Sequence, residues 1–280
     1  MSTPLVSADW LAQQLDDATV VVVDATMPPV GVTPPVDCRA CYLERHIPGA
    51  VFFDIEEFSD HSTGLPHSLP TAEDFAEGMA ALGVGDQMTI VVYEQAGVYS
   101  APRAWWMLRT FGVERVYLLD GGLQAWVAAG LPTESGAVRR ARVPFAARLK
   151  AGAVEDFAGI ERAIAGHEQI LDARSAGRFA GTLPEPRAGL RSGHMPGATS
   201  VPFVELAADG RMKSPEELRA YFAAKGVDME KPLVTSCGSG VTAAVVSLGL
   251  ELAGASDVRL YDGSWAEYAS RAGAVIEVED

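Results

Sequence analysis

An internal repeat constrains the fold of this chain more than any other feature. Three phrases of the first half recur in the second half in the same order: a strand-like run ending in Asp-Ala, a His-x-Pro-Gly-Ala phrase and an Asp-Gly phrase. They occupy residues 22–25, 46–50 and 119–122, and again residues 170–173, 194–198 and 261–265. Self-similarity on this scale indicates a duplicated domain.

Strand and helix patterns alternate within each copy. A β-branched run at residues 20–24 and short, largely apolar runs at residues 89–93 and 116–119 predict strands, and the segments between them predict helices. The alternation predicts an α/β fold of two tandem domains, each a mainly parallel sheet with helices on both faces. We expect domains over residues 1–131 and 153–280, joined by a polar, basic linker over residues 132–152.

The loop at residues 237–242, Cys-Gly-Ser-Gly-Val-Thr, holds the most informative chemistry. Residues 233–235 before it predict a buried strand, and residues 241–252 predict a buried helix. Its two glycines allow a sharp turn in which successive backbone N–H groups face inward. Such a turn at a helix N-terminus favours an anion, so Cys237 is predicted to be a nucleophilic thiolate.

Cys237 has three alternative interpretations: a buried structural residue, a phosphatase nucleophile or a protease nucleophile. A free cysteine at a strand end is often only a small buried residue. A phosphatase-type loop requires an arginine six positions after the cysteine, where this chain has Ala243. The local signature of papain-like proteases is absent around Cys237.

The two copies differ at this loop. Opposite Cys237 the first copy has Glu94, so only the second copy is predicted to carry cysteine chemistry. The first copy is also longer between its His phrase and its Asp-Gly phrase. These phrases lie 74 positions apart in the first copy and 68 positions apart in the second. We expect the surplus in the loop at residues 60–70, which contains His61 and His67 and is predicted to reach the cysteine of the other copy.

Charge and composition exclude several classes of protein. A net charge of −15 disfavours binding to nucleic acid or to an anionic membrane surface. No apolar run approaches the ~20 residues of a membrane span, and the N-terminal residues 1–4 show no export signal. Three cysteines, an odd number, fit a reducing compartment, so we expect a cytoplasmic protein.

Two of those cysteines, Cys38 and Cys41, form a lone Cys-x-x-Cys in a Pro-rich stretch predicted to be a loop. Without a second pair of ligands the zinc interpretation is weak. A regulatory disulfide remains open, and the favoured interpretation is two incidental thiols.

The sequence resembles the two-domain sulfurtransferases of the rhodanese superfamily, and among them the 3-mercaptopyruvate sulfurtransferases. The likeness lies in the two His-x-Pro-Gly-Ala phrases, the two Asp-Gly phrases and the cysteine loop, and covers nearly the whole chain. Relatives that use thiosulfate carry basic residues directly after the cysteine, where this chain has Gly238 and Ser239. Because thiosulfate is a dianion, it benefits from such cations.

The resemblance implies a substrate site. It assigns Arg178 and Arg187 to the family's clamp positions, where two guanidiniums would grip the carboxylate and keto oxygen of 3-mercaptopyruvate. A single arginine is more often part of a surface ion pair, so the motif context carries this assignment. The loop residues expected to contact substrate are Gly238, Gly240, Val241 and Thr242.

The resemblance also implies a proton relay. An acid, an imidazole and a hydroxyl at Glu56, His67 and Ser239 would move protons between Cys237, the substrate thiol and the departing carbon. Some members of the family have aspartate where Glu56 stands.

The implied reaction has two steps. The sulfur of 3-mercaptopyruvate forms a persulfide on Cys237 with release of pyruvate, and then passes to a thiol, thioredoxin or cyanide. The resemblance implies no metal and no organic cofactor. The alternatives are a thiosulfate sulfurtransferase, and a non-catalytic persulfide carrier or binding module.

Overall fold

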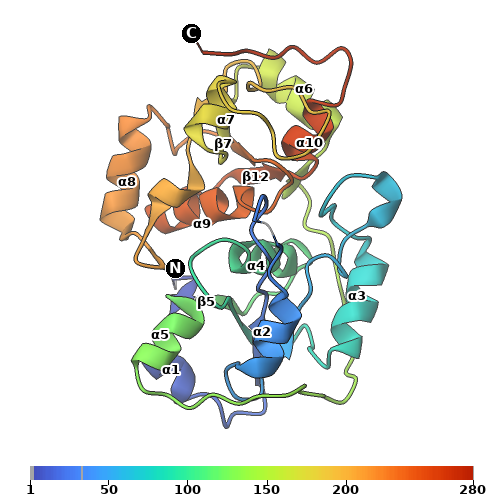
Figure 1. Ribbon diagram of the computed structural model, residues 1–280, viewed down its shortest axis with the longest axis vertical. Coiled ribbons are helices and arrows are strands. Elements are labelled where there is room, and N and C mark those ends of the chain that lie inside the picture. The colour runs from blue at the N-terminus through green and yellow to red at the C-terminus, as the bar shows by residue number, and fades with distance from the viewer. Residues whose placement is uncertain (1–2, 33, 280) are drawn as a thin grey trace. The chain divides into compact units, whose positions relative to one another are not determined.

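The computed structural model describes residues 3–32 and 34–279, so the first two residues of the segment searched for an export signal lie outside it. By its contacts the chain divides into two compact units (Figure 1). The first unit consists of Met1–Asp60, Leu69–Lys150 and Asp209–Met212, and the second of His61–Ser68, Ala151–Ala208 and Lys213–Asp280. Each half of the chain therefore contributes one short segment to the unit formed mainly by the other half.

The first unit is built on a five-stranded parallel sheet in the order β1-β5-β4-β2-β3. Val22 of β2 and Val91 of β4 share one core with Leu11 and Trp126 from two helices. The alternate residues, such as Val92, are also fully buried, so both faces of the sheet are covered. The strands are β1 (Leu5–Val6), β2 (Val20–Asp24), β3 (Val51–Phe52), β4 (Thr89–Tyr93) and β5 (Val116–Leu119). The helices are α1 (Ala8–Ala12), α2 (Cys38–Glu44), η1 (His61–Thr63), α3 (Ala72–Ala81), α4 (Ala101–Thr110) and α5 (Gly122–Ala128), of which η1 is grouped with the second unit.

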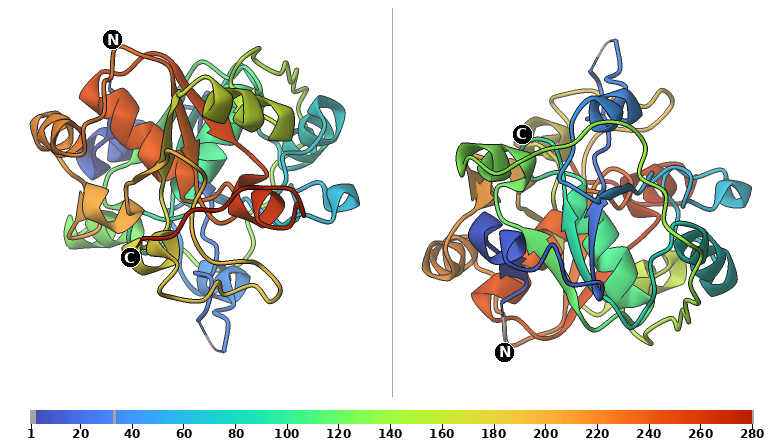
Figure 2. Two further views of the ribbon diagram at one scale, coloured as in Figure 1. Left: turned by 90° about the horizontal axis from the view of Figure 1, so that it is seen from above. Right: turned by 90° about the horizontal axis from the view of Figure 1, so that it is seen from below.

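The second unit repeats this plan in the order β6-β12-β11-β7-β8, again with parallel pairing. Helices flank each sheet in the views of Figures 1 and 2, and the predicted fold class is confirmed. The strands are β6 (Val154–Glu155), β7 (Gln169–Asp172), β8 (Thr199–Ser200), β9 (Ala207–Ala208), β11 (Leu233–Ser236) and β12 (Val258–Tyr261), with β10 (Arg211–Met212) grouped with the first unit. The helices are α6 (Phe157–Ala165), α7 (Ala176–Ala180), η2 (Phe203–Leu206), α8 (Pro215–Ala224), α9 (Ala243–Ala253) and α10 (Ser264–Tyr268).

The strand registers identify equivalent positions in the two units. Asp24 of β2 pairs with Tyr93, the last residue of β4, and Asp172 of β7 pairs with Ser236, the last residue of β11. The next residues, Glu94 and Cys237, therefore occupy the same place at the carboxyl end of a central strand. In open parallel sheets this end is where ligands bind.

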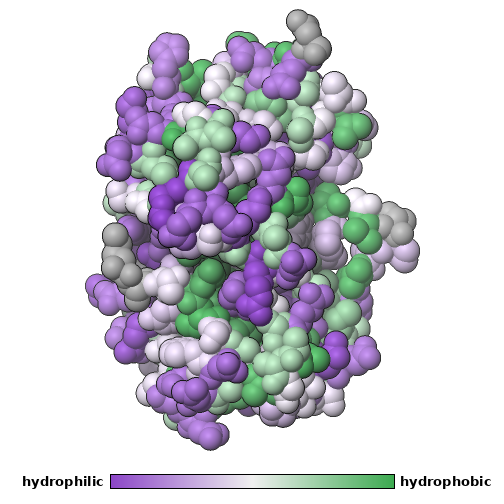
Figure 3. Space-filling model, turned by 90° about the vertical axis from the view of Figure 1, so that its left-hand side faces the viewer, coloured by the Kyte–Doolittle hydropathy of each residue, from purple (hydrophilic) through white to green (hydrophobic). Residues whose placement is uncertain are grey.

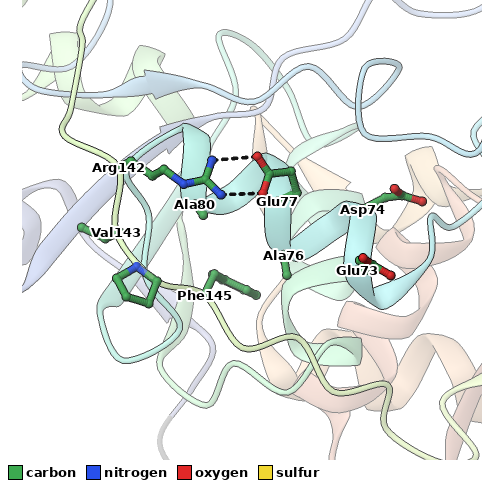
Figure 4. Close-up of a pocket in the computed structure, with 9 residues that line it drawn as sticks. Glu73, Asp74, Ala76, Glu77, Ala80, Arg142, Val143 and Phe145 are labelled. Carbon is green, nitrogen blue, oxygen red and sulfur yellow. Dashed lines mark hydrogen bonds and ion pairs between the residues drawn. The ribbon is translucent and has the colours of Figure 1, made fainter.

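Most of the segment predicted as a linker packs along the first unit. The backbone N–H of Arg148 donates to the carbonyl of Phe111 at 2.9 Å. The ring of Phe145 is buried and meets Phe75 edge-on at 5.7 Å. Arg142 forms a two-pronged ion pair with Glu77 of α3 (Figure 4). The basic charges of this segment are thus partly used by the first unit itself.

Cys38 and Cys41 were predicted to lie in a loop, and this prediction is wrong. They lie in α2, whose N-cap Asp37 accepts a hydrogen bond from the N–H of Ala40 at 2.9 Å. The prolines shortly before Asp37 favour a loop in the sequence, so Asp37 was not recognised there as the start of a helix. Both thiols are free. Burial, the neighbouring Cys41 and nearby carboxylates raise the pKa of Cys38 to about 11, so its thiol stays protonated at neutral pH.

Hydrophilic side chains are spread over the face of the molecule that Figure 3 shows, with smaller groups of hydrophobic residues between them. Among the helices within residues 3–32 and 34–279, none has the length and apolar character needed to cross a membrane.

Candidate active site

The loop that contains Cys237 is fixed at the carboxyl end of β11. The side chain of Cys237 is buried, with 2% exposure for the residue. The carbonyls of Cys237 and Gly238 accept hydrogen bonds from the N–H groups of Trp265 at 2.9 Å and Ala266 at 3.0 Å. Helix α10 therefore holds both residues in place from behind.

Ser264 braces the same loop from inside. Its Oγ accepts hydrogen bonds from the N–H groups of Cys237 at 3.2 Å and Gly240 at 3.1 Å, and donates to the carbonyl of Tyr261 at 2.8 Å. Ser264 has φ 47°, in the left-handed region that favours glycine. The equivalent residue of the first unit is Gly122, with φ 54°. Sequence reasoning missed Ser264, although a comparison of the two copies at this position would have revealed it.

The backbone N–H groups of the loop are divided between two roles. Two of them, those of Cys237 and Gly240, donate to Oγ of Ser264. Within the part of the chain that the structure describes, the other four donate to no group and are available to an anion at the start of the 11-residue helix α9. They belong to Gly238, Ser239, Val241 and Thr242.

The two arginines predicted to clamp the substrate converge beside the cysteine. A Cβ atom at Gly238 would lie 3.0 Å from Nη2 of Arg178 and 3.7 Å from Nη1 of Arg187. Nη2 of Arg187 also donates to Oγ of Ser239 at 3.2 Å. Because Gly238 has no side chain, both guanidiniums approach the residue that directly follows Cys237.

A buried ion-pair network supports one of these arginines, Arg178. The guanidinium of Arg174 is bonded to Asp172, with Nη2 to Oδ2 at 2.6 Å, and to Glu185, with Nη1 to Oε1 at 2.8 Å. Burial opposes the charge on Arg174, but the two carboxylates outweigh it and raise its pKa above the usual value. Sequence reasoning passed over Arg174 and Glu185, although each stands in a segment that carries a clamp arginine.

His67 lies beside the loop hydroxyl. Its Nδ1 is 3.0 Å from Oγ of Ser239, and contacts group the segment His61–Ser68 with the second unit. His67 has φ 58°, an unusual conformation for a residue other than glycine, and is 7% exposed. Because Arg187 can only donate to Ser239 Oγ, the hydroxyl hydrogen is left to donate to His67 Nδ1 when that nitrogen is unprotonated.

Glu56, the third residue of the predicted relay, belongs to the first unit. It is exposed in the turn after β3, where its N–H donates to Oδ1 of Asp54 at 3.0 Å. Its part in a relay stays a prediction that the resemblance implies. As for metals, no three His, Cys, Asp or Glu side chains within residues 3–32 and 34–279 are grouped so that they could hold an ion.

The equivalent loop of the first unit contains a carboxylate instead of a thiol. Oε1 of Glu94 accepts hydrogen bonds from the N–H groups of Tyr99 at 2.8 Å and Ala101 at 3.2 Å, and Oε2 accepts from the N–H of Ser100 at 3.1 Å. Burial raises the pKa of Glu94 to about 7, against the opposing effect of these hydrogen bonds. Here the chain fills its own anion site.

The chain is similar to known proteins in sequence and in fold. The chain matches the model of the rhodanese-like domain over residues 7–129 and 159–271. It is 47% identical over 279 residues to the 3-mercaptopyruvate sulfurtransferase of Escherichia coli strain K12, covering 99% of this chain and 98% of that protein. It is 45% identical to the human 3-mercaptopyruvate sulfurtransferase, covering 96% and 92%. The crystal structure of SseA from Escherichia coli matches with a TM-score of 0.87 at 46% identity, covering 94% of this chain and 99% of that chain.

Proposed function

The chain belongs to the rhodanese family, and we propose that it is a sulfurtransferase that takes the sulfur of 3-mercaptopyruvate onto Cys237 and releases pyruvate. The observation that carries this proposal is the approach of Arg178 and Arg187 to Gly238, next to a buried cysteine at the start of α9. The arginines suit the carboxylate and keto oxygen of the substrate, and the helix terminus suits an anionic sulfur.

In the first step the Cys237 thiolate attacks the sulfur of 3-mercaptopyruvate. A sulfur–sulfur bond forms and the carbon–sulfur bond breaks, with its electron pair passing to the carbon to give the enolate of pyruvate. The proton of the substrate thiol moves to that carbon, so pyruvate leaves and Cys237 carries a persulfide. The N–H groups of Gly238, Ser239, Val241 and Thr242 stabilise the anionic sulfur.

Proton transfer in this step is assigned to Ser239 and His67. The 3.0 Å separation between Ser239 Oγ and His67 Nδ1 supports a hydroxyl–imidazole pair that receives the thiol proton and returns it to carbon. Glu56 is the proposed acidic partner of His67, by resemblance to the family.

A thiosulfate sulfurtransferase is the alternative function. The residues after the cysteine, Gly238 and Ser239, are neutral and favour the monoanionic 3-mercaptopyruvate over the dianionic thiosulfate. The second step would pass the outer sulfur to a thiol, thioredoxin or cyanide. Three free cysteines support a reducing compartment such as the cytoplasm as the place of action.

Pyruvate release in the presence of a thiol acceptor tests the proposal. The wild-type chain should release pyruvate from 3-mercaptopyruvate with a higher kcat/KM than it shows for sulfur transfer from thiosulfate, and Cys237→Ser should release none above the uncatalysed rate. Substantial pyruvate release by Cys237→Ser would refute the proposed role of Cys237. A preference for thiosulfate would establish the alternative, and a folded wild-type chain without turnover would favour a binding module.

A further inference from the structure

We propose that Glu185 is a positioning residue that gives the two substrate arginines different tasks. It neutralises Arg178 and holds Nη2 of that guanidinium beside Gly238, and it leaves Arg187 as the uncompensated positive charge of the site. This inference rests on the proposed function, and it adds a determinant of donor charge that lies outside the cysteine loop.

The contact between Glu185 and Arg178 is two-pronged. Oε1 of Glu185 accepts from Nε of Arg178 at 3.1 Å, and Oε2 accepts from Nη2 at 2.5 Å. The Nε–Nη2 edge of the guanidinium is therefore occupied, and the Nη1–Nη2 end remains for a ligand. Nη2 itself lies 3.0 Å from a Cβ position on Gly238, so the nitrogen that Glu185 holds is also the one beside the cysteine loop.

Glu185 is itself held from behind and cannot follow Arg178. Its side chain is 2% exposed, and its Oε1 also accepts from Nη1 of Arg174 at 2.8 Å. Arg174 donates to the carbonyl of Gly193 at 2.7 Å and lies over the ring of Trp265, 4.1 Å from its centroid. The backbone N–H of Trp265 donates to the carbonyl of Cys237. The orientation of Arg178 is therefore linked, through Glu185, Arg174 and Trp265, to the backbone of the reacting residue.

Apart from the Cys237 thiolate, which the N–H groups of its own loop stabilise, the charged side chains of the site leave a single positive charge. The guanidiniums of Arg174, Arg178 and Arg187 are set against the carboxylates of Asp172 and Glu185. Within the described residues, Arg187 forms no ion pair with a carboxylate, so the uncompensated charge belongs to it. A monoanion balances this charge in a poorly solvated site, whereas a dianion leaves one negative charge unpaired, which is costly.

Two substitutions separate charge from orientation. Glu185→Gln keeps the length of the side chain and removes its charge, so the ratio of kcat/KM for thiosulfate to kcat/KM for 3-mercaptopyruvate should rise about tenfold. Glu185→Asp keeps the charge, but its side chain is too short to contact both Arg174 and Arg178. It should lower kcat/KM for 3-mercaptopyruvate about tenfold, chiefly through KM, and leave the donor ratio within about twofold of wild type.

Glu155→Gln is the matched control. Glu155 lies on β6, at the edge of the same sheet and two strands away from β11. It is also a poorly exposed carboxylate, at 11%, and pairs with Arg259 of the neighbouring strand β12. This variant should leave both the donor ratio and KM unchanged. An equal shift in Glu155→Gln, or an unchanged donor ratio in folded Glu185→Gln, would overturn the inference. If Glu185→Gln does not fold, Glu185→Asp decides, and an unaltered KM for 3-mercaptopyruvate in that variant overturns it.

A binding measurement keeps the inference separate from the proposed function. Calorimetric titration of the wild type should give a lower Kd for pyruvate, a monoanion, than for sulfate, a dianion, and Glu185→Gln should reduce the ratio of the two affinities about tenfold. If the wild type releases no pyruvate from 3-mercaptopyruvate, the proposed function fails while this titration still tests Glu185. If turnover is normal and the affinity ratio does not change, only the inference about Glu185 fails.

Discussion

The loops that follow β4 and β11 occupy equivalent places in the two units and hold their anions differently. In the first unit the carboxylate of Glu94 accepts the N–H groups at the start of α4. In the second unit Ser264 accepts two loop N–H groups, and four others are available in the described part of the chain beside Cys237. The same loop position thus holds a side chain that occupies the backbone N–H groups in one copy, and a reactive thiol beside available N–H groups in the other.

The comparison teaches that the backbone alone does not make the site. Both loops put N–H groups at a helix N-terminus, where an anion is stabilised. What distinguishes the second loop is a nucleophile in place of the filling carboxylate, together with Arg178 and Arg187 beside Gly238. Each difference can be altered separately, and the resulting predictions follow from the largest expected effect to the smallest.

Giving the second loop the residue of the first should abolish activity. In Cys237→Glu the carboxylate should accept loop N–H groups as Glu94 does, so the unit should stay folded while kcat/KM falls by roughly a thousandfold or more. Pyruvate release and thermal unfolding measure the two effects, with Cys237→Ser as the control for loss of the thiol. Loss of folding in Cys237→Glu but not in Cys237→Ser would show that the loops are not equivalent.

The first unit should lose stability as the pH rises, because of Glu94. Burial raises the pKa of Glu94 from 4.5 to about 7, so between these values the folded state retains a proton that the unfolded state has lost. This contribution is present below pH 4.5 and is lost as the pH rises to 7, a change of about 3 kcal/mol at about 1.4 kcal/mol for each pKa unit. Glu94→Gln should remove this pH dependence and leave kcat/KM within about twofold of wild type.

Denaturant unfolding at pH 5 and pH 8 measures this effect through tryptophan fluorescence. Four of the five tryptophans lie in the first unit, and only Trp265 lies in the second. Glu114→Gln is the control, since Glu114 is an exposed carboxylate of the same unit. An equal pH dependence in the wild type and Glu94→Gln would contradict the assignment.

The contact between Ser239 and His67 should act as one unit. Ser239→Ala and His67→Gln should each lower kcat for pyruvate release about a hundredfold, and the double variant should fall little further, because both remove the same proton path. His61→Gln, in the same segment, should stay within about twofold of wild type. Effects that multiply in the double variant would mean that the two residues act independently.

Removing the brace of the second loop should have the smallest effect. Ser264→Gly recreates the residue of the first unit, Gly122, and removes the hydroxyl that accepts from Cys237 and Gly240. We expect kcat/KM to fall about tenfold through misplacement of the loop. Stability should change by no more than about 1 kcal/mol, because relief of the positive φ offsets the lost hydrogen bonds.

Ser264→Ala is the matched variant, since it loses the hydroxyl and keeps the unfavourable φ. It should be less stable than Ser264→Gly, as thermal unfolding would measure. Full activity in both variants would show that the loop does not depend on this hydroxyl.

The repeat and the long periodic elements could be predicted from the sequence. The strands at residues 20–24, 89–93 and 116–119 were predicted with the bounds observed, because buried parallel strands read as nearly continuous apolar runs. Helix α2 was missed because proline-rich neighbours hid the capping Asp37. The packing of residues 142–150 against the first unit is not apparent in the sequence, because apolar contacts such as that of Phe145 are isolated along it.

The reacting residue was easier to predict than its supports. Cys237 stands out through its glycines and its place between a strand and a helix. Glu185 and Arg174 do not, because only the folded chain puts their charges together. Ser264 takes its importance from a backbone conformation that no local pattern indicates.

Mass spectrometry of the chain after exposure to 3-mercaptopyruvate without an acceptor tests the central claim most directly. The account predicts a gain of one sulfur atom, about 32 Da, on the peptide that contains Cys237, matched by one equivalent of released pyruvate. Pyruvate release without that gain, or a gain confined to Cys38 or Cys41, would contradict it.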